Sequence, residues 1–581
     1  MINIHNFINQ PVNNTSPTSM YFNGENLICT EKGIYFFKGA QFDTFTFYNG
    51  FFIDKWSENT QLNNLNLAIS GEGEAKVSLI HRDRSGREVI LSSFLGDLCQ
   101  MPEICIDDYS SLKKGCIYFK LEPIADGILH NARFYTNQIP PNNVKLGLVI
   151  THFNRIAEVN KSFNRIYNEL LLDGYYEDKI KLKIIDNSQN SGIQSNNHVE
   201  VINNQNLGGS GGFTRGLLEL DDDGSYTHCL FMDDDASCEI ESIKRTYQLL
   251  QYAKDPKLAI AGSLLREDKP DIIWEKGAYF DGICRPVHGG VCASNTNNLQ
   301  VVESKDRGDI YGAWWFFAFN IKEVSHYPIP FFVRGDDISF SLTNDFKIMT
   351  MNGIASYGED FGVKSGALPL YLDLRSHLVE QLHILGDSKF KLCRTIVRFF
   401  GLATMSYQYG TARALIQAVD DFIAGPEFFD QNKDMSSRFG LIKSYAKDEV
   451  LSDEEFDPVE LAWNSLEESK LRYVIRLLTL NGHLVPSIFF SKQTVFQPKG
   501  FRAHFREIFL HKKVRYVNTS NNTSYVSEMN RKELAKLSIM MLKRIKFILS
   551  NYDQIKHNYK NNMPDIMTKS YWNNVYKTEG L

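Results

Sequence analysis

Three consecutive aspartates close an apolar segment near the middle of the chain. They are Asp233, Asp234 and Asp235, and they follow THCLFM, which has the composition of a buried strand. Ligands of open α/β sheets bind beyond the carboxyl ends of the strands. Side chains two residues apart in an extended chain point the same way, so Asp233 and Asp235 suit a divalent cation that bridges two phosphates. The alternative interpretation is a solvated acidic turn.

A glycine-rich segment, NLGGSGGF at residues 206–213, precedes a predicted helix. Four glycines in five residues let backbone N–H groups approach a ligand closely. A dinucleotide-binding fingerprint is disfavoured, because Thr214 stands where its third glycine belongs and the segment follows the third strand of its unit. We interpret the segment as a phosphate-binding turn, with a flexible turn as the alternative.

Two further residue pairs lie downstream. Trp314 and Trp315 suit a sugar-binding surface if they are exposed, and they are core residues if they are buried. Asp336 and Asp337 follow an apolar segment, and one carboxylate of such a pair can accept a proton while its neighbour orients the ligand. The sequence thus offers both a candidate general base and a candidate metal site.

Three regions are predicted to position these residues. Residues 1–140 carry short runs rich in Phe, Tyr, Ile and Val at intervals of about 8–12 residues, typical of an antiparallel β-sandwich or jelly roll. Residues 144–385 alternate buried strands with helical patterns, which predicts an α/β, Rossmann-like domain with a mostly parallel sheet. Residues 386–581 are predicted to be helical, and the proline-containing residues 137–143 form the expected linker.

Size and composition limit the classes of protein. The 581 residues exceed one ordinary core, and the 43% hydrophobic content excludes a disordered chain. The formal charge of −6 argues against a nucleic-acid-binding protein. Nine cysteines without a CxxC pair indicate reduced thiols. No leader peptide and no membrane-spanning run is recognisable, so we expect a cytoplasmic protein that is at most peripheral to a membrane.

The charge is unevenly distributed along the chain. Residues 501–581 contain fifteen Lys and Arg against six Asp and Glu, and apolar residues recur at helical steps from Leu534 to Ile548. One interpretation is a helix packed on the rest of the protein with a solvated basic face. The other is a basic amphipathic helix on the anionic inner face of the cytoplasmic membrane.

In this order, the motifs resemble those of GT-A glycosyltransferases of family 2, and more narrowly galactofuranosyltransferases of the mycobacterial galactan polymerase type. The resemblance spans about residues 145–385 and is carried by THFNR, IDN, NQNLGGSGGFTRG, FMDDD, GAWW and RGDDISFSL. It implies an inverting enzyme that uses UDP-galactofuranose to build a bacterial cell-surface polysaccharide. It also implies a nucleotide-sugar donor and a lipid-linked glycan acceptor, and an oligomer is compatible with it.

The resemblance further implies roles for individual residues. Asp233 and Asp235 would bind Mn2+ or Mg2+, and Asp337 would be the catalytic base with Asp336 beside it. The substrates would be contacted by the remaining matched residues, which are Arg155, Asp186, Asn206, Gly208, Gly209 and Asp234 for the donor nucleotide and Trp314 and Trp315 for the acceptor.

One position departs from the family pattern. Gly358 stands where a metal-binding His is usual, although Glu359, Phe361 and Lys364 still match. Glu359 or Asp360 is the expected substitute as an oxygen ligand. Because Mg2+ keeps several waters in protein sites, a site of two carboxylates is chemically workable.

Two other functions stay open at this level. A family 2 transferase for another sugar, such as rhamnose, would share these motifs. A non-catalytic carbohydrate-binding or scaffold subunit of a polysaccharide assembly complex is the second alternative, and the glycine at position 358 is its support. Turnover of a panel of sugar donors would separate the three functions.

Overall fold

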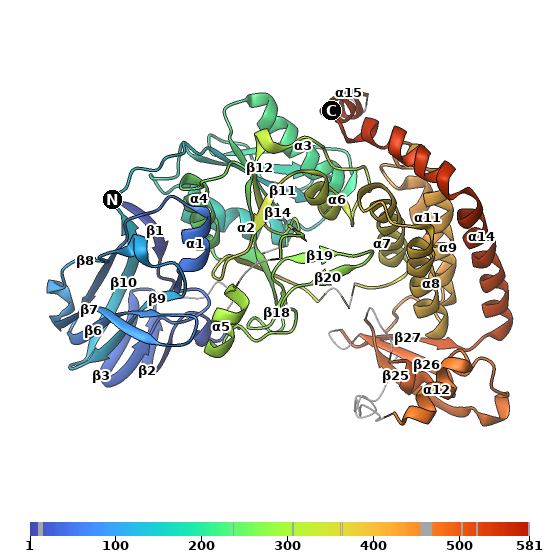
Figure 1. The fold of residues 1–581 in the computed structure, drawn as a ribbon, viewed down its shortest axis with the longest axis horizontal. Coiled ribbons are helices and arrows are strands. Elements are labelled where there is room, and N and C mark those ends of the chain that lie inside the picture. Colours follow the sequence, from blue (N-terminus) through green and yellow to red (C-terminus); the bar gives the residue numbers. More distant parts are fainter. Residues whose placement is uncertain are drawn as a thin grey trace.

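The three predicted regions follow one another along an elongated molecule (Figure 1). An all-β region lies at one end, the α/β domain in the middle and the C-terminal region at the other end. The computed structural model describes residues 1–9, 15–235, 237–304, 307–360, 362, 364–453, 468–500, 504–518 and 521–578.

The N-terminal region is an antiparallel β domain, although the run at residues 43–56, predicted to be a strand, instead holds the short strand β4 (Phe51–Phe52) and the start of helix α1 (Ile53–Asn59). β3 (Gly33–Asp43) pairs with β10 (Gly127–Thr136) near its start and with β9 (Cys116–Pro123) near its end, so the sheet closes over a shared aromatic core. The remaining elements are β1 (Ile2–Asn6), β2 (Asn23–Thr30), β5 (Asn66–Glu72), β6 (Glu74–Arg82), β7 (Glu88–Asp97) and β8 (Ile104–Cys105).

The α/β domain is built on a seven-stranded sheet of order β13-β12-β11-β14-β22-β16-β23. β11 to β14 run parallel, and β22 is antiparallel to both of its neighbours, which confirms the mostly parallel sheet. The strands are β11 (Leu146–His152), β12 (Ile180–Asp186), β13 (Val199–Asn203), β14 (His228–Asp233), β16 (Leu258–Ala261), β22 (Phe317–Asn320) and β23 (Lys347–Met349).

Helices cover both faces of this sheet, which explains why its strands are apolar on both sides. Val149 and Ile185 pack against α3 (Gly208–Asp223). Leu148 packs on the opposite face, in the same core as α4 (Ile240–Gln251). The third covering helix is α2 (Ile156–Ile166).

The register of the sheet brings the candidate residues to one edge. Parallel pairing sets His152 opposite Asp186 and Thr151 opposite Asp233, and Asp186 in turn lies opposite Asn203. The four parallel strands therefore end together, and the loops that follow them meet at the same edge.

Two small sheets and two helices complete the domain beside this edge. The strand orders are β15-β24-β17-β18 and β20-β19-β21. Their elements are β15 (Ser237–Cys238), β17 (Ser263–Arg266), β18 (Ile273–Glu275), β19 (Ala278–Phe280), β20 (Cys284–Pro286), α5 (Thr296–Glu303), β21 (Ile310–Tyr311), α6 (Asp336–Thr343) and β24 (Ala355–Gly358).

The C-terminal region is not wholly helical, which corrects the prediction for residues 386–581. β25 (Ser491–Pro498), β26 (His511–Asn518) and β27 (Thr523–Glu528) form a three-stranded sheet, because alternate residues such as Val514 and Tyr516 enter a small separate core. The helices are α8 (Lys389–Met405), α9 (Tyr409–Ala424), α10 (Pro426–Gln431), α11 (Ser436–Tyr445), α12 (Lys470–Leu478), α13 (Phe505–Ile508), α14 (Arg531–Asn562) and α15 (Lys569–Thr578).

The helical body also begins earlier than residue 386. α7 (Ala367–Val379) packs against α8 and α9, so it belongs to this body rather than to the α/β domain. At the other end, α15 returns to the α/β domain: Tyr576 Oη donates to the carbonyl oxygen of Gly211 at 2.6 Å, and Trp572 Nε1 donates to that of Pro328 at 2.8 Å. The two parts are thereby joined at both ends of the helical body.

Arg245 of α4 fastens the N-terminal region to the α/β domain. Its buried guanidinium donates to the carbonyl oxygens of Tyr48, Asn6 and Gly353 at 2.7, 2.9 and 3.1 Å. We expect Arg245→Met to lower the free energy of unfolding by about 3 kcal/mol or more, since each buried carbonyl left without a donor costs about 1–3 kcal/mol. Urea denaturation followed by circular dichroism measures this loss.

The matched control for this prediction is Arg87→Met, which removes an exposed arginine from the N-terminal region. It should change the free energy of unfolding by less than about 0.5 kcal/mol. Equal stability of the two variants would contradict the fastening role of Arg245.

Candidate active site

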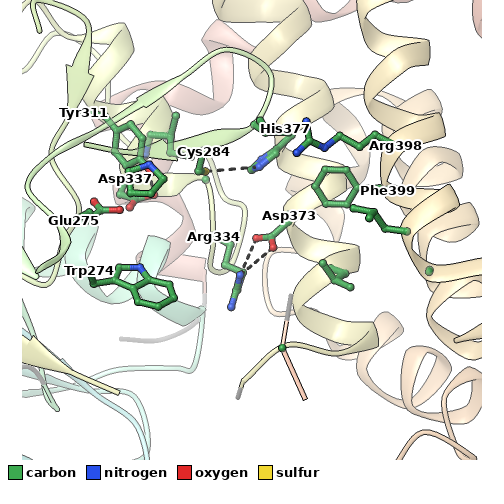
Figure 2. Close-up of a pocket in the computed structure, with 18 of the residues that line it drawn as sticks. Trp274, Glu275, Cys284, Tyr311, Arg334, Asp337, Asp373, His377, Arg398 and Phe399 are labelled. Atoms are coloured by element: carbon green, nitrogen blue, oxygen red, sulfur yellow. Dashed lines mark hydrogen bonds and ion pairs between the residues drawn. The ribbon is translucent and has the colours of Figure 1, made fainter. Parts of the chain in front are cut away.

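A cavity of about 590 Å³ lies where the α/β domain meets the helical body. Figure 2 shows Glu275, Tyr311 and Asp337 on one wall, and His377 of α7 with Phe399 of α8 on the other. Aromatic rings beside carboxylates suit a polyhydroxylated ligand, because the rings pack on its apolar faces and the carboxylates bind its hydroxyl groups.

Asp337 lies on the wall of this cavity, in the first turn of α6. Its Oδ1 accepts a hydrogen bond from the backbone N–H of Ile338 at 2.9 Å. Burial raises the pKa of Asp337 to about 6. Such a carboxyl group is mostly ionised at neutral pH and is more basic than an ordinary aspartate, so it is suited to accept a proton.

Asp336 points away from the cavity and toward the glycine-rich segment. Its Oδ2 accepts a hydrogen bond from Ser210 Oγ at 3.1 Å, and a Cβ at Gly209 would lie 3.2 Å from the same oxygen. Burial, with the charge of Asp337, raises the pKa of Asp336 to about 8. The placement corrects the role predicted for Asp336: it anchors the loop that carries Asp337 and does not reach a ligand in the cavity.

The glycine-rich segment holds that same loop. Gly208 has φ of +68°, and a Cβ there would lie 2.1 Å from the carbonyl oxygen of Phe332. The N–H of Gly208 donates to Asn206 Oδ1 at 3.1 Å, and the N–H of Ser210 donates to Phe332 at 3.0 Å. These two N–H groups are therefore used inside the protein, which corrects the expectation that Gly208 presents its N–H to a phosphate.

Asp233 and Asp234 lie at the acidic end of β14. Burial raises the pKa of both side chains, and the nearby charge of Asp235 raises it further. The pKa of Asp234 is raised to about 6. Asp234 Oδ2 contacts His152 Nδ1 at 3.2 Å and accepts a hydrogen bond from the backbone N–H of Phe153 at 3.3 Å. Asp234 is thus held by β11, whereas Asp233 lies among carboxylates whose charge a cation would neutralise.

Asp235 lies beside two cations. It forms an ion pair with Arg155, and its Oδ2 is 3.5 Å from Lys364 Nζ. Lys364 also pairs with Glu359 at 2.9 Å. Positive charge from two side chains therefore gathers at the edge where a diphosphate was predicted to bind.

The carboxylates fit a hydrated divalent cation held by Asp233 and Asp235, but the described residues supply no third protein ligand. Among the described residues, no group of three metal-ligating side chains converges. Asp360, one of the two expected substitutes, pairs with Arg266 at 3.2 Å. Gly358 provides no ligand, and Phe361 lies outside the described residues.

Asp186 and Asn206 also lie at this edge, beyond β12 and β13. Burial alone would raise the pKa of Asp186, yet hydrogen bonds from the N–H groups of Ser191 and Ser188, at 2.8 and 3.1 Å, lower it. Asp186 is therefore a fixed anion. Arg155 contacts the acidic end of β14 through Asp235, and Asp186 lies at the same edge of the sheet with β11 between it and β14.

The two tryptophans occupy different environments. Trp314 is only 5% exposed and packs in an aromatic core, with ring centroids of Phe213 and Phe231 both 5.1 Å away. Trp315 lines the cavity, and its Nε1 donates to the carbonyl oxygen of Gly262 at 3.2 Å. The prediction that Trp314 lines the acceptor pocket is wrong, because the turn before β22 directs its ring into the aromatic core.

Sequence reasoning missed several titratable residues of the cavity, among them Glu275, Asp373 and His377. Glu275 ends β18, and burial, with the charge of Asp337, raises its pKa to about 8. Asp373 accepts two hydrogen bonds from Arg334 at 2.9 and 3.0 Å, and His377 lies one turn further along α7. The signal for the last two was their four-residue spacing in a helical pattern, which sets both on one face.

Comparison with known proteins agrees with the motifs. No protein-family model matches the chain. Galactofuranosyltransferase GlfT2 of Mycobacterium tuberculosis is 24% identical over 420 residues, which is 66% of this chain and 65% of that protein. Galactofuranosyltransferase GlfT2 of Mycolicibacterium smegmatis is 24% identical over 417 residues, which is 66% of this chain and 64% of that protein.

The chain resembles galactofuranosyltransferases. The match spans less than two thirds of the length of either relative. Among solved structures, a mannosyltransferase from Pyrobaculum calidifontis in complex with GDP-Man and Mn2+ is similar with a TM-score of 0.28 and 12% identity, covering 53% of this chain and 84% of that one.

Proposed function

We propose that this protein is an inverting GT-A glycosyltransferase that transfers galactofuranose from UDP-galactofuranose to a bacterial cell-surface polysaccharide. The observation that carries the proposal is the position of Asp337: it lies on the wall of the cavity, and its charge acts on Asp233 at the acidic end of β14. A base for the acceptor and a site for the donor diphosphate are therefore adjacent.

In the proposed reaction an acceptor hydroxyl in the cavity attacks the anomeric carbon of the donor. A bond forms between the acceptor oxygen and that carbon while the bond from the carbon to the phosphate oxygen breaks, and its electron pair leaves with UDP. Asp337 takes the hydroxyl proton. Inversion follows because attack and departure are on opposite faces of the sugar.

The acidic edge then stabilises the leaving diphosphate. Asp233 and Asp235 would hold Mn2+ or Mg2+, which neutralises charge developing on the leaving group. Arg155 and Lys364, both beside Asp235, add two positive charges from the protein itself. The fixed carboxylate of Asp186 would bind a hydroxyl group of the nucleoside.

The remaining cavity side chains would bind the acceptor sugar. With a pKa of about 8, Glu275 is mostly protonated at neutral pH and can donate a hydrogen bond to a sugar oxygen. Trp315 and Tyr311 offer ring faces to the apolar side of the sugar. These groups would fix the hydroxyl that Asp337 deprotonates.

The proposed base predicts a pH dependence. Only the carboxylate form of Asp337 accepts a proton, and its pKa is raised to about 6, so kcat should rise as the pH increases through about 6 and fall below it. Several charged groups act on Asp337 or line the cavity with it: Asp336, Arg334, Glu275, Asp373, His377, Glu380, Arg398 and Asp233. Initial rates across buffers test this, and a flat profile through that range would contradict it.

A peripheral membrane contact through α14 is part of the proposal. Leu537, Met541 and Ile548 pack into the helical body, whereas Lys543 and Lys546 are exposed. Arg544, by contrast, pairs with Asp420 at 2.8 Å and is structural. No helix among the described residues is long and apolar enough to cross a bilayer.

Reversing the two exposed lysines should weaken this contact. We expect Lys543→Glu combined with Lys546→Glu to reduce sedimentation with anionic liposomes at low salt, since each lysine near such a surface contributes about 1 kcal/mol. Lys32→Glu with Lys38→Glu, in the exposed surface of the N-terminal domain, is the matched control and should sediment as the wild type does. Equal loss in both pairs would contradict a specific role for α14.

A panel of donors tests the proposed function. Purified protein is incubated with a lipid-linked acceptor and UDP-galactofuranose, UDP-galactopyranose or dTDP-rhamnose, and products are detected by mass. Product from UDP-galactofuranose supports the proposal. Product from dTDP-rhamnose alone would indicate another family 2 transferase, and no product from any donor would favour a non-catalytic carbohydrate-binding subunit.

A further inference from the structure

α12 (Lys470–Leu478) presents its apolar side to the outside. Leu471, Val474, Ile475 and Leu478 follow one another at three- and four-residue steps, so they share one face of the helix. Leu471 is 70% exposed and Leu478 is 74% exposed. None of the residues of α12 is buried.

The charged side of the same helix faces the protein. Arg472 Nη2 donates to the carbonyl oxygen of Arg506 at 3.0 Å, and its guanidinium lies 5.6 Å from the ring centroid of Phe509. Arg476 forms a two-pronged pair with Glu468, at 2.8 Å for both hydrogen bonds. A surface helix normally buries its apolar stripe and exposes its charges, so α12 has the opposite orientation.

The exposed apolar surface continues past the helix into the 3-10 turn η8 (Ser487–Phe489). Ile488 is 84% exposed. We call the whole surface the α12 patch; it consists of Leu471, Val474, Ile475, Leu477, Leu478, Leu480, Leu484, Ile488 and Phe489. An apolar patch of this extent marks a surface that meets a partner or a membrane.

The part of the chain that carries the α12 patch is rich in basic residues. Residues 468–560 contain eighteen Lys and Arg against five Asp and Glu. Lys470 and Lys492 are exposed at either end of the patch. Arg531, the first residue of α14, donates to the carbonyl oxygen of Val485 and lies 5.7 Å from the ring centroid of Phe490, which brings the N-terminal end of α14 beside the patch.

We propose that the α12 patch inserts into the interfacial layer of an anionic membrane. Aliphatic side chains flanked by lysines are complementary to such a layer, because the apolar tips enter the acyl region while the ammonium groups stay with anionic headgroups. The insertion adds a hydrophobic contact to the electrostatic membrane contact of α14. This inference rests on the proposed function, which gives the membrane contact its purpose.

Insertion would bring the cavity to the membrane. Asn481, next to the patch, donates from Nδ2 to the carbonyl oxygen of Met405 at 3.0 Å, and the neighbouring Ser406 lines the cavity. Figure 1 shows α12 at the end of the molecule opposite the N-terminal β domain. A lipid-linked acceptor held in the bilayer would therefore meet the cavity from the side that carries the patch.

The test is flotation of full-length protein with vesicles of phosphatidylglycerol and phosphatidylcholine. We expect the triple variant Leu471→Glu, Leu478→Glu, Ile488→Glu to lose at least tenfold in vesicle partition. The matched control changes three equally exposed residues elsewhere, Ile90, Leu95 and Ile139, to Glu; they are 62%, 66% and 85% exposed. The control should float as the wild type does, and equal flotation of the patch variant would overturn the proposal.

A second measurement separates insertion from adsorption. In Leu478→Trp the added tryptophan should be quenched by lipids brominated on their acyl chains, whereas in Leu95→Trp the added tryptophan should not be. Lack of added quenching in Leu478→Trp would overturn insertion. So would a wild type that ignores vesicles but forms a dimer which the triple variant loses, because the patch would then bind a second copy of the chain.

Different results would reject the inference and the proposed function. Donor hydrolysis in detergent-free buffer should be the same in the triple variant and the wild type, since none of the three residues lines the cavity. Vesicle insertion without turnover of any sugar donor would reject the proposed function and leave this inference standing.

Discussion

Asp337→Asn is expected to lower transfer at least a hundredfold while UDP binding is retained. The asparagine fills the same space, and its carbonyl can still accept the hydrogen bond from Ile338, which is 2.9 Å in the aspartate. Its amide cannot take the acceptor proton at neutral pH. A general base contributes about 10²–10⁴-fold to a rate, so the loss should fall in that range.

Single-turnover transfer and a UDP titration on the same preparation measure the two quantities. Asp345→Asn, which alters an exposed aspartate just beyond α6, is the control and should transfer at the wild-type rate. If Asp337→Asn retains transfer, or if it loses UDP binding in proportion, Asp337 is not the base.

Asp235→Ala is expected to lower the rate of transfer on the order of a thousandfold, because a bound metal ion contributes several kcal/mol of charge stabilisation. The same change should weaken UDP binding and make it independent of Mn2+. The substitution also releases Arg155 and Lys364, which pair with Asp235 in the wild type. Calorimetric titration of UDP with and without Mn2+ tests the metal contribution apart from catalysis.

Two variants accompany this prediction. Asp178→Ala, in an exposed turn, should leave both titrations unchanged. Gly358→His would place a nitrogen ligand at this position of β24 and should raise Mn2+ affinity. A Cβ at position 358 would lie 3.1 Å from its nearest neighbour, Leu264 Cδ1. Mn2+-dependent UDP binding that survives Asp235→Ala would show that the ion is held elsewhere.

The sequence was sufficient for the parts of the site that follow from local pattern. The apolar runs before Asp186 and Asp233 predicted two strands of a mostly parallel sheet, and the parallel register, with β11 between them, brings both carboxylates to one edge. Asp337 was predicted from its motif, and it lies on the cavity wall.

The residues that were missed or misassigned depend on long-range packing. Trp314 and Trp315 are adjacent, yet only the packing of Phe213 and Phe231 decides that the first enters the core. Glu275 becomes part of the cavity because β18 pairs with β17, and no sequence pattern near Glu275 indicates that pairing.

The same reasoning applies to the C-terminal region. The pattern of α14 predicted a helix with one apolar stripe, and that stripe is buried in the helical body. α12 has an equally regular apolar stripe, but its charged face is the one held by the protein, through Arg472 and Arg476. Periodicity identifies the faces of a helix, whereas only tertiary contacts decide which face is buried.

The central claim is that Asp337 serves as the base for transfer of galactofuranose. Its most direct test is mass detection of product from UDP-galactofuranose and a lipid-linked acceptor, with wild type and Asp337→Asn compared at equal UDP occupancy. The account predicts glycosylated acceptor with the wild type and at least a hundredfold less with the variant. Equal product from both proteins, or none from the wild type with this donor, would contradict it.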